Sequence, residues 1–202
     1  VVRLTADRCL LIKGMLSGDT AQGAGTLGRI RERERLDVLT VTDERGRVLW
    51  RTSNSGLKDD DRSQDAFVRA VLEQRQPVAA ACLVSAEELR AESPELSKRA
   101  YFRFIPTPMA RLRNQTEETS GMMLKAAAPI LDQGTNLLGV VYGGVLVSRD
   151  HELVDKIKHT VFQNLEYKGK DIGTATIFQD DLRISTNVRN EDGSRAIGTR
   201  VA

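Results

Sequence analysis

The sequence predicts an α+β fold in which a five-stranded antiparallel sheet is flanked by helices. Two pairs of extended apolar runs, at 36–52 and 122–148, are each joined by a short polar turn, as in β-hairpins. A fifth run, 78–84, stands alone between segments whose apolar residues recur at helical spacing. A doubly wound parallel sheet needs a helix between successive strands, and the two hairpins exclude it.

The first 35 residues are predicted to be a helical segment. Residues 1–16 carry an irregular apolar stripe without an N-cap, so we expect the end of a longer helix that continues a transmembrane helix. We expect 17–25 to form a loop and 26–35 a short charged helix. Within this stretch, Gly23–Gly28 matches the dinucleotide fingerprint, but no buried strand precedes it, so the sequence favours a flexible loop over a nucleotide site.

The first hairpin is predicted from Leu36–Thr42 and Arg47–Thr52, with Gly46 at the turn position that needs a positive φ. A polar loop, 53–62, then leads to a helix that ends before Pro77. The remaining expected elements are a strand at 78–84, a helix opened by the capping box Ser85–Glu88 and interrupted at Pro94, an extended run 101–105, a loop 106–120, strands 122–131 and 137–148, a helix 150–162, a linker 163–173 and a hairpin formed by 174–178 and 183–188.

Composition and motifs exclude several classes of function. The 202 residues hold 30 Lys and Arg against 28 Asp and Glu, and acids alternate with the bases, so a nucleic-acid surface is not expected. We find no hydrolase elbow, zinc-protease or P-loop motif, so no catalytic residue and no cofactor is assigned. His151 and His159 are too far apart to share a metal, and Asp59–Asp61 lacks the EF-hand spacing, so no metal site is assigned.

Candidate ligand-binding residues are polar groups inside segments that are otherwise apolar. Lys125 shares a strand face with Met123 and Ala127, so it either extends to solvent at an edge or faces an anion. Tyr101 and Arg103 alternate with two phenylalanines, and Tyr142 precedes Gly143-Gly144, where missing side chains leave room for a ligand. If these groups are buried together, they suit a small carboxylate, with Arg103 as its main partner. The alternative is a set of separate edge residues with solvated tips.

Several motifs resemble the tandem (double) Cache sensor family over about residues 35–201. These motifs are Thr107-Pro-Met-Ala-Arg-Leu-Arg, Glu118-Thr-Ser-Gly-Met-Met-Leu-Lys-Ala-Ala-Ala-Pro-Ile, Gly139-Val-Val-Tyr-Gly-Gly-Val-Leu-Val, Leu153-Val-Asp-Lys-Ile-Lys-His-Thr-Val-Phe, Lys168-Gly-Lys-Asp-Ile-Gly-Thr-Ala-Thr-Ile-Phe-Gln-Asp-Asp-Leu-Arg-Ile-Ser-Thr-Asn-Val and Arg195-Ala-Ile-Gly-Thr-Arg-Val. The resemblance implies a PAS-like fold in the periplasm, held between two helices of the inner membrane. It also implies a small ligand, often an organic acid, and fixes none of the four candidate residues.

The family's second module continues beyond the last of these motifs. We therefore expect an N-terminal helical segment at 1–35, a complete PAS-like module at 36–162, and a linker with the opening hairpin of a second module at 163–202. The expected function is extracytoplasmic sensing for a sensor histidine kinase that acts as a receptor homodimer. The alternatives are a methyl-accepting chemotaxis receptor and a periplasmic enzyme of unknown type.

Overall fold

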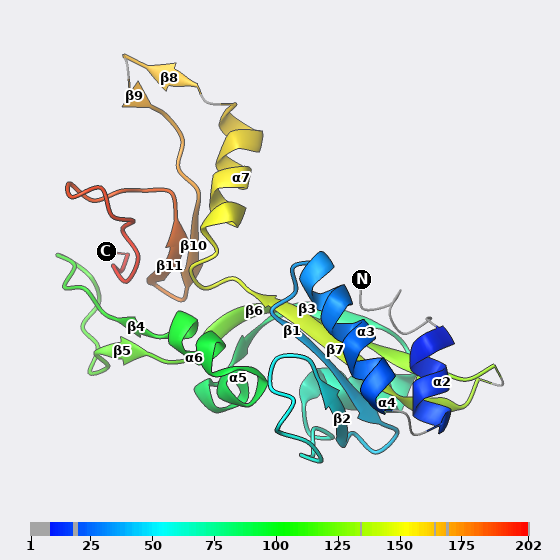
Figure 1. Ribbon diagram of the computed structural model, residues 1–202. Helices are drawn as coiled ribbons and strands as arrows, with labels where there is room; N and C mark the ends of the chain where they lie inside the picture. Colours follow the sequence, from blue (N-terminus) through cyan, green and yellow to red (C-terminus); the bar gives the residue numbers. More distant parts are fainter. Residues whose placement is uncertain (1–8, 18–19, 134, 164, 169, 202) are drawn as a thin grey trace. The chain divides into compact units, whose positions relative to one another are not determined.

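The computed structural model describes residues 9–17, 20–133, 135–163, 165–168 and 170–201 (Figure 1). Its main feature is a five-stranded antiparallel sheet in the order β2-β1-β7-β6-β3, which confirms the predicted α+β, PAS-like fold. The strands of this sheet are β1 (Val38–Asp43), β2 (Val48–Arg51), β3 (Val78–Val84), β6 (Gly121–Leu131) and β7 (Leu137–Leu146).

The chain divides into two compact units. The sheet unit takes in the described residues up to Cys82, together with Glu88–Leu96 and Met123–Val145. The hairpin unit takes in Leu83–Glu87, Ser97–Met122 and the described residues from Leu146 onward. In this division the helix that follows β7 belongs to the same unit as the C-terminal hairpin. The predicted division into 1–35, 36–162 and 163–202, with 163–202 as the opening of a second module, stays a prediction.

The first hairpin forms as predicted. Thr40 pairs with Arg51 and Val41 with Trp50 across β1 and β2. At the turn, Gly46 has φ +85°, and a Cβ there would come within 2.8 Å of the Ser63 backbone. A glycine is therefore required for both conformation and space.

The N-terminal segment forms helices α2 (Cys9–Ser17) and α3 (Thr20–Arg33). The expected loop at 17–25 is wrong over most of its length, because α3 begins at Thr20 and contains the glycine-rich stretch. Leu27 and Ile30 are buried against the sheet, and this packing offsets the low helix propensity of the glycines. The rest of the helix predicted at 1–16, residues 1–8, lies outside the described residues.

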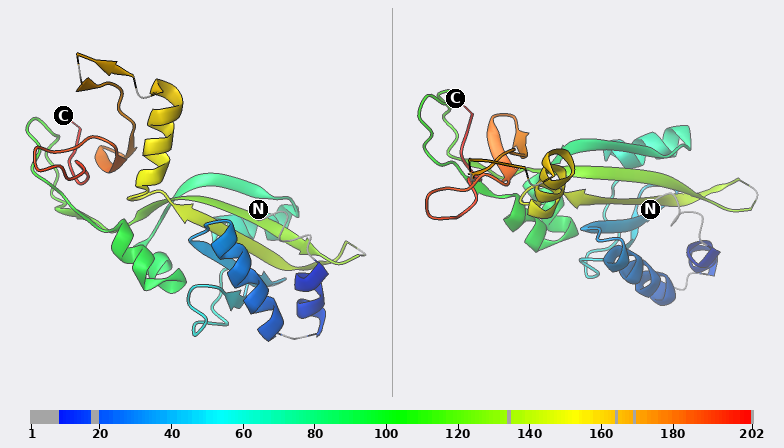
Figure 2. Two further views of the ribbon diagram at one scale, coloured as in Figure 1. Left: turned by 45° about the horizontal axis from the view of Figure 1, so that its top comes forward. Right: turned by 90° about the horizontal axis from the view of Figure 1, so that it is seen from above.

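The two faces of the sheet are covered by different helices (Figure 2). One face packs Leu39, Val41, Val141 and Ile130 against α3 in an apolar core. The opposite face carries Lys125, which stacks on Phe67 of helix α4 (Ala66–Gln74). Alternation along β6 therefore separates an apolar face from a face that contains buried charge.

The helices that follow β2 and β3 agree with the sequence predictions: α4 ends before Pro77, and a helix boundary falls at Pro94. The Asp65 side chain caps α4 by accepting from the backbone N–H groups of Phe67 and Val68, and α4 ends at Arg75, which has φ 55°. After β3, helix α5 (Ala86–Glu92) is followed at once by α6 (Pro94–Ala100). Pro94 sits at the first turn of α6, so the predicted interruption is confirmed.

The hairpin unit holds the remaining elements. Phe102 from this unit's strand β4 packs with Leu182 and Ile184 in its core. Helix α7 runs beside the C-terminal hairpin, where the Ser185 hydroxyl donates to the Asp150 carbonyl at 2.7 Å (Figure 1). The elements of the unit are β4 (Phe102–Arg103), β5 (Glu117–Glu118), α7 (His151–Phe162), β8 (Glu166–Tyr167), β9 (Lys170–Asp171), β10 (Thr176–Gln179) and β11 (Leu182–Thr186).

Candidate functional site

A group of buried and half-buried polar side chains lies on the sheet face that Phe67 of α4 covers. We call it the Tyr142 cluster, and all of its members belong to the sheet unit. Burying a charge is costly unless the charge is paired, so the pairing of these groups decides what the cluster can do. The cluster consists of Thr40, Arg51, Asp60, Arg62, Asp65, Glu88, Glu92, Lys125 and Tyr142.

Glu92 is the acceptor at one end of the cluster. Its carboxylate accepts hydrogen bonds from the Thr40 hydroxyl (2.9 Å), from Arg51 Nε (3.1 Å) and from the Tyr142 hydroxyl (2.7 Å). Burial and the neighbouring Glu92 charge raise the pKa of Tyr142 well above its ordinary value. Tyr142 therefore stays a neutral hydrogen-bond donor.

Arg51 connects Glu92 to the loop that precedes α4. Its guanidinium makes a two-pronged contact with the Asp60 carboxylate, at 2.9 Å for both bonds, and its side chain is fully buried. Burial alone would lower the pKa of Arg51, but the hydrogen bond with Asp60 and the charge of Glu92 raise it above its ordinary value. This end of the cluster is a complete ion-paired network.

Asp65 is the acceptor at the other end. Its Oδ1 caps α4, while its Oδ2 accepts from Lys125 Nζ and from Arg62 Nη2, the latter at 3.2 Å. Burial by itself would raise the pKa of Asp65, but Lys125 lowers it below the ordinary value. Two cations thus converge on a single carboxylate oxygen.

The surroundings of these two cations differ. Lys125 Nζ lies over the rings of Phe67 and Tyr142, 5.2 and 5.1 Å from their centroids, so aromatic faces stabilise its charge. Arg62 also donates to Glu88 at 2.7 Å. Its Nε is buried and, among the residues described, has no hydrogen-bond partner. The donors at this end therefore exceed the acceptors that the described chain supplies.

The structure brings together two of the four predicted site residues, Lys125 and Tyr142. Lys125 is buried on the face shared with Met123 and Ala127, and it faces an anion rather than solvent. The anion is the protein's own Asp65, which sequence reasoning did not identify. The alternative of a solvated edge lysine is wrong, because β6 lies inside the sheet between β7 and β3.

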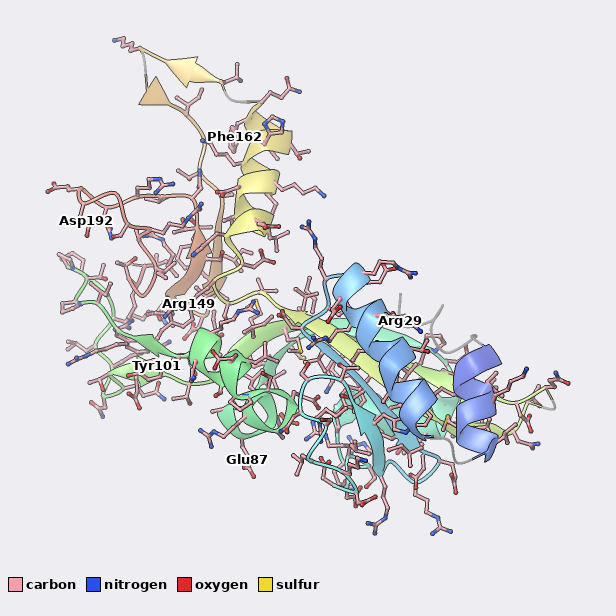
Figure 3. The ribbon with its side chains drawn as sticks, viewed as in Figure 1. Arg29, Glu87, Tyr101, Arg149, Phe162 and Asp192 are labelled. Carbon is pink, nitrogen blue, oxygen red and sulfur yellow. The ribbon has the colours of Figure 1, made fainter. Side chains whose placement is uncertain are left out.

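The other two predicted residues, Tyr101 and Arg103, lie in the hairpin unit. Their expected burial is wrong: Tyr101 is 40% exposed and donates to Glu117 at 2.9 Å, and the Arg103 side chain is also exposed. Phe102 is buried on the other side of β4, so strand alternation turns its neighbours outward. Arg149 donates to the Tyr101 carbonyl at 2.8 Å, and both residues are marked in Figure 3.

Gly143 and Gly144 beside Tyr142 line a pocket of about 410 Å³, together with Lys125 and Leu124, so the expected free space is present there. Gly144 also admits the neighbouring strand, because a Cβ at this position would come within 2.7 Å of the Leu124 carbonyl oxygen and 2.9 Å of the Met123 sulfur. A role of this space in ligand binding stays a prediction.

The motifs weighed for metals and nucleotides have other structural roles. Asp60 binds Arg51, and Asp61 accepts from the Ser63 backbone at 2.8 Å. Within the described ranges, no group of three or more His, Cys, Asp or Glu side chains could hold a metal ion. The glycine-rich fingerprint lies inside α3 and not in a loop between a strand and a helix.

Comparison with known proteins points to one type of fold. Residues 145–202 match the family model described as single cache domain 3. No curated protein matches the chain significantly. The chain aligns with the periplasmic domain of LuxQ from Vibrio cholerae at a TM-score of 0.50 and 14% identity, covering 96% of this chain and 72% of that one.

Other solved structures align over similar lengths. The domain of a putative sensory box/GGDEF family protein from Vibrio parahaemolyticus aligns at a TM-score of 0.51 and 9% identity, covering 92% of this chain and 62% of that one. The sensor domain of the histidine kinase DctB from V. cholerae aligns at 0.49 and 12% identity, covering 89% and 73%.

Residues 145–202 thus resemble a single Cache domain, and the chain shares its fold with the periplasmic and sensory domains named above. Because the family model covers only the last part of the chain, the tandem arrangement stays a prediction. Among the residues described, none of the helices has the length and apolar character needed to span a bilayer.

Proposed function

We propose that this chain is the extracytoplasmic sensing domain of a transmembrane sensor histidine kinase and that its ligand is a small organic acid. In this proposal the domain faces the periplasm, belongs to a receptor homodimer in the inner membrane, and binds its ligand without converting it. The Cache-type fold and the match of residues 145–202 support a sensing role. The chemistry of the Tyr142 cluster supports the ligand class.

One observation carries the ligand assignment: Lys125 and Arg62 converge on Asp65 Oδ2, and Arg62 Nε is buried without a partner in the described chain. Two cations around one oxygen form a carboxylate-binding arrangement whose present occupant is intramolecular. A ligand carboxylate that takes this place keeps both cations paired. It also accepts from Arg62 Nε, which Asp65 does not reach.

Replacement of the Asp65 carboxylate by the ligand's carboxylate would transmit the signal through α4. Asp65 is at once the acceptor for Lys125 and the N-cap of α4. A ligand that takes over Lys125 frees Asp65 Oδ2 and loosens the first turn of α4 from β6. The ligand thereby distinguishes two arrangements of one helix, as a sensing equilibrium requires.

The test is a screen of small mono- and dicarboxylates, read by melting temperature and by NMR of the acids. At about one hundred times its dissociation constant, a true ligand adds roughly 2.7 kcal/mol of stability, a melting shift of about 5 to 10 °C. Lys125→Met should remove most of the shift, whereas the exposed Lys58→Met should preserve it. A full shift in Lys125→Met would place the ligand elsewhere, and turnover of the acid would favour an enzyme.

Arg103 and Tyr101 remain part of the proposal as predicted ligand groups. Their exposure makes them accessible to a ligand, although the Tyr101 hydroxyl already donates to the Glu117 carboxylate. Arg103→Ala in the same screen tests the prediction that this guanidinium holds the carboxylate. If Arg103→Ala keeps the full shift for an acid that binds, Arg103 is not a ligand.

The proposed output and assembly need separate tests. The coding sequence on both sides of this chain should contain hydrophobic spans of roughly 20 residues and a histidine kinase. A methyl-accepting segment in place of the kinase would identify a chemotaxis receptor instead. Dimerisation is tested by sedimentation of the receptor with its membrane helices, and a strictly monomeric receptor would contradict it.

A further inference from the structure

A second cationic site lies in the hairpin unit and is distinct from the Tyr142 cluster. A pocket of about 520 Å³ is formed there by the loop after β4 and by Arg200. This volume lies within the usual range of small-molecule sites, about 300–1,000 Å³. Three guanidinium-bearing residues line it, together with apolar residues: Arg111, Arg113 and Arg200, with Phe104, Ile105 and Pro108. We call it the arginine pocket.

The loop that forms the arginine pocket is held in place by specific bonds. The Phe104 N–H donates to the Thr116 carbonyl at 2.9 Å, which closes the base of the loop. The Arg200 backbone N–H donates to the Thr107 hydroxyl at 3.0 Å, and Arg200 Nη2 donates to the Arg111 carbonyl at 2.7 Å. Arg200 also lies 5.7 Å from the Phe104 ring centroid. The pocket is thus a shaped feature and not a gap between loose segments.

The charges of the three arginines are not all neutralised by ion pairs. Arg200 pairs with Asp181 at 2.7 Å, and Arg113 pairs with Asp180 and with Asp181, the latter at 3.3 Å. The Arg111 guanidinium has no ion pair or hydrogen bond to any residue that the structure describes. No acidic residue is among the described residues that line the pocket. Arg111 and Arg113 also line a second pocket that contains Asp180 and Asp181, so the three arginines exceed these two carboxylates by one positive charge.

We propose that the arginine pocket binds an organic anion that carries a carboxylate on an apolar body. Arg111 binds the carboxylate through paired N–H groups, as guanidinium groups do. Phe104, Ile105 and Pro108 bury the apolar part, which a small inorganic anion lacks. This site does not depend on the carboxylate site proposed at Lys125, since the two lie in different units.

Benzoate is a suitable probe because it joins one carboxylate to one apolar ring. Titration into uniformly labelled protein, followed by amide NMR, should shift the amides of residues 104–116 and 198–200 in a saturable way. Acetate and inorganic phosphate are the comparison anions. We expect both to bind at least about tenfold more weakly than benzoate, because they lack the apolar contact.

The matched variants are Arg111→Gln and Arg90→Gln. Both arginines are exposed, and neither substitution removes a buried group, so both variants should fold with unchanged melting temperature. We expect Arg111→Gln to weaken benzoate binding about tenfold or more and Arg90→Gln to leave it unchanged. Lys125→Met should also leave it unchanged, which separates this site from the one in the sheet unit.

Four results would overturn the proposal. The first is the absence of saturable benzoate binding up to about 10 mM. The second is equal affinity in wild type and Arg111→Gln. The third is benzoate binding that is lost in Lys125→Met but kept in Arg111→Gln, which would support the site in the sheet unit and reject this one. Phosphate binding as tight as benzoate binding would reject the proposed apolar contact and the ligand class with it.

Discussion

The Tyr142 cluster and the arginine pocket use the same chemical groups in different surroundings. In the cluster, the Arg51 side chain is 0% exposed and Glu92 7%, and Arg51 of β2 pairs with Glu92 of helix α5. In the pocket region, Asp180 is 69% exposed and Arg111 is exposed, whereas Arg200 and Asp181 are 10% and 15% exposed. Because the cost of an unpaired charge grows with burial, ion pairs should matter most for stability in the cluster and less beside the pocket. A ligand must therefore displace a protein carboxylate in the cluster but not in the pocket.

The largest effect is expected for Arg51→Leu. This change leaves Glu92 and Asp60 without their shared cation, one of them deeply buried. We expect unfolding in urea to show a loss of about 3 to 5 kcal/mol. Arg45→Ala is the control, since that side chain is 80% exposed and should change stability by less than about 0.5 kcal/mol. Similar small losses in both variants would show that the cluster is not held by its charges.

The next largest effect is expected for the Asp65–Lys125 ion pair, whose interaction energy a double-mutant cycle measures. Lys125→Met leaves a buried carboxylate with Arg62 alone, so we expect a loss of about 2 kcal/mol. Asp65→Asn preserves a good N-cap for α4 but removes the anion. The double variant should lose less than the sum of the two singles, with a coupling of about 0.5 to 3 kcal/mol. Strict additivity would contradict a direct ion pair.

A lower pH should reduce the stability of the sheet unit, because the carboxylates of Asp60 and Asp65 become protonated. The pKa of Asp60 and that of Asp65 both lie below the ordinary value, because pairing with Arg51 and Lys125 outweighs burial. A lowered pKa in the folded state stabilises the protein above the unfolded pKa, about 3.9, and this stability is lost as the pH falls through the folded value. Urea unfolding between about pH 6 and 3 should show the decline, and Asp65→Asn should make it shallower. An unchanged slope would exclude Asp65 as a contributor.

The smallest effect is expected beside the arginine pocket. Asp181→Asn removes the carboxylate shared by Arg113 and Arg200, whose side chains are 27% and 10% exposed. We expect a loss of about 1 kcal/mol in unfolding free energy, because Arg113 keeps Asp180 and Arg200 keeps the Arg111 carbonyl as acceptors. The same change should strengthen benzoate binding, because it leaves more positive charge at the pocket. A loss as large as that of Arg51→Leu would remove the contrast between the two regions.

Much of the fold follows from local patterns, and the exceptions have physical causes. The strand Val78–Val84 and the turn at Gly46 are set by residues close in sequence, so they could be predicted. Helix α3 could not, because its glycines disfavour a helix, and only the burial of Leu27 and Ile30 on the sheet stabilises it. Local propensity was outweighed there by tertiary packing.

The candidate site was predictable only in part, for a related reason. Lys125 and Tyr142 interrupt apolar strands, and that interruption is visible in the sequence. Asp65, the partner of Lys125, precedes an ordinary helix and is 60 residues away, and Glu92, the partner of Tyr142, is 50 residues away, so nothing local connects either pair. A sequence signal did exist for Arg51, a charge beside Trp50 in a predicted strand, but its carboxylate partners lie on other elements.

The most direct test of the central claim is the affinity of Asp65→Asn for a small carboxylate that binds the wild-type protein. If Asp65 occupies the ligand's place on Lys125 and Arg62, removing its charge while keeping the N-cap should tighten binding about tenfold in calorimetric titration. Lys125→Met in the Asp65→Asn background should abolish that gain. Unchanged or weaker binding by Asp65→Asn would contradict the account, because a competitor cannot be removed without benefit to the ligand.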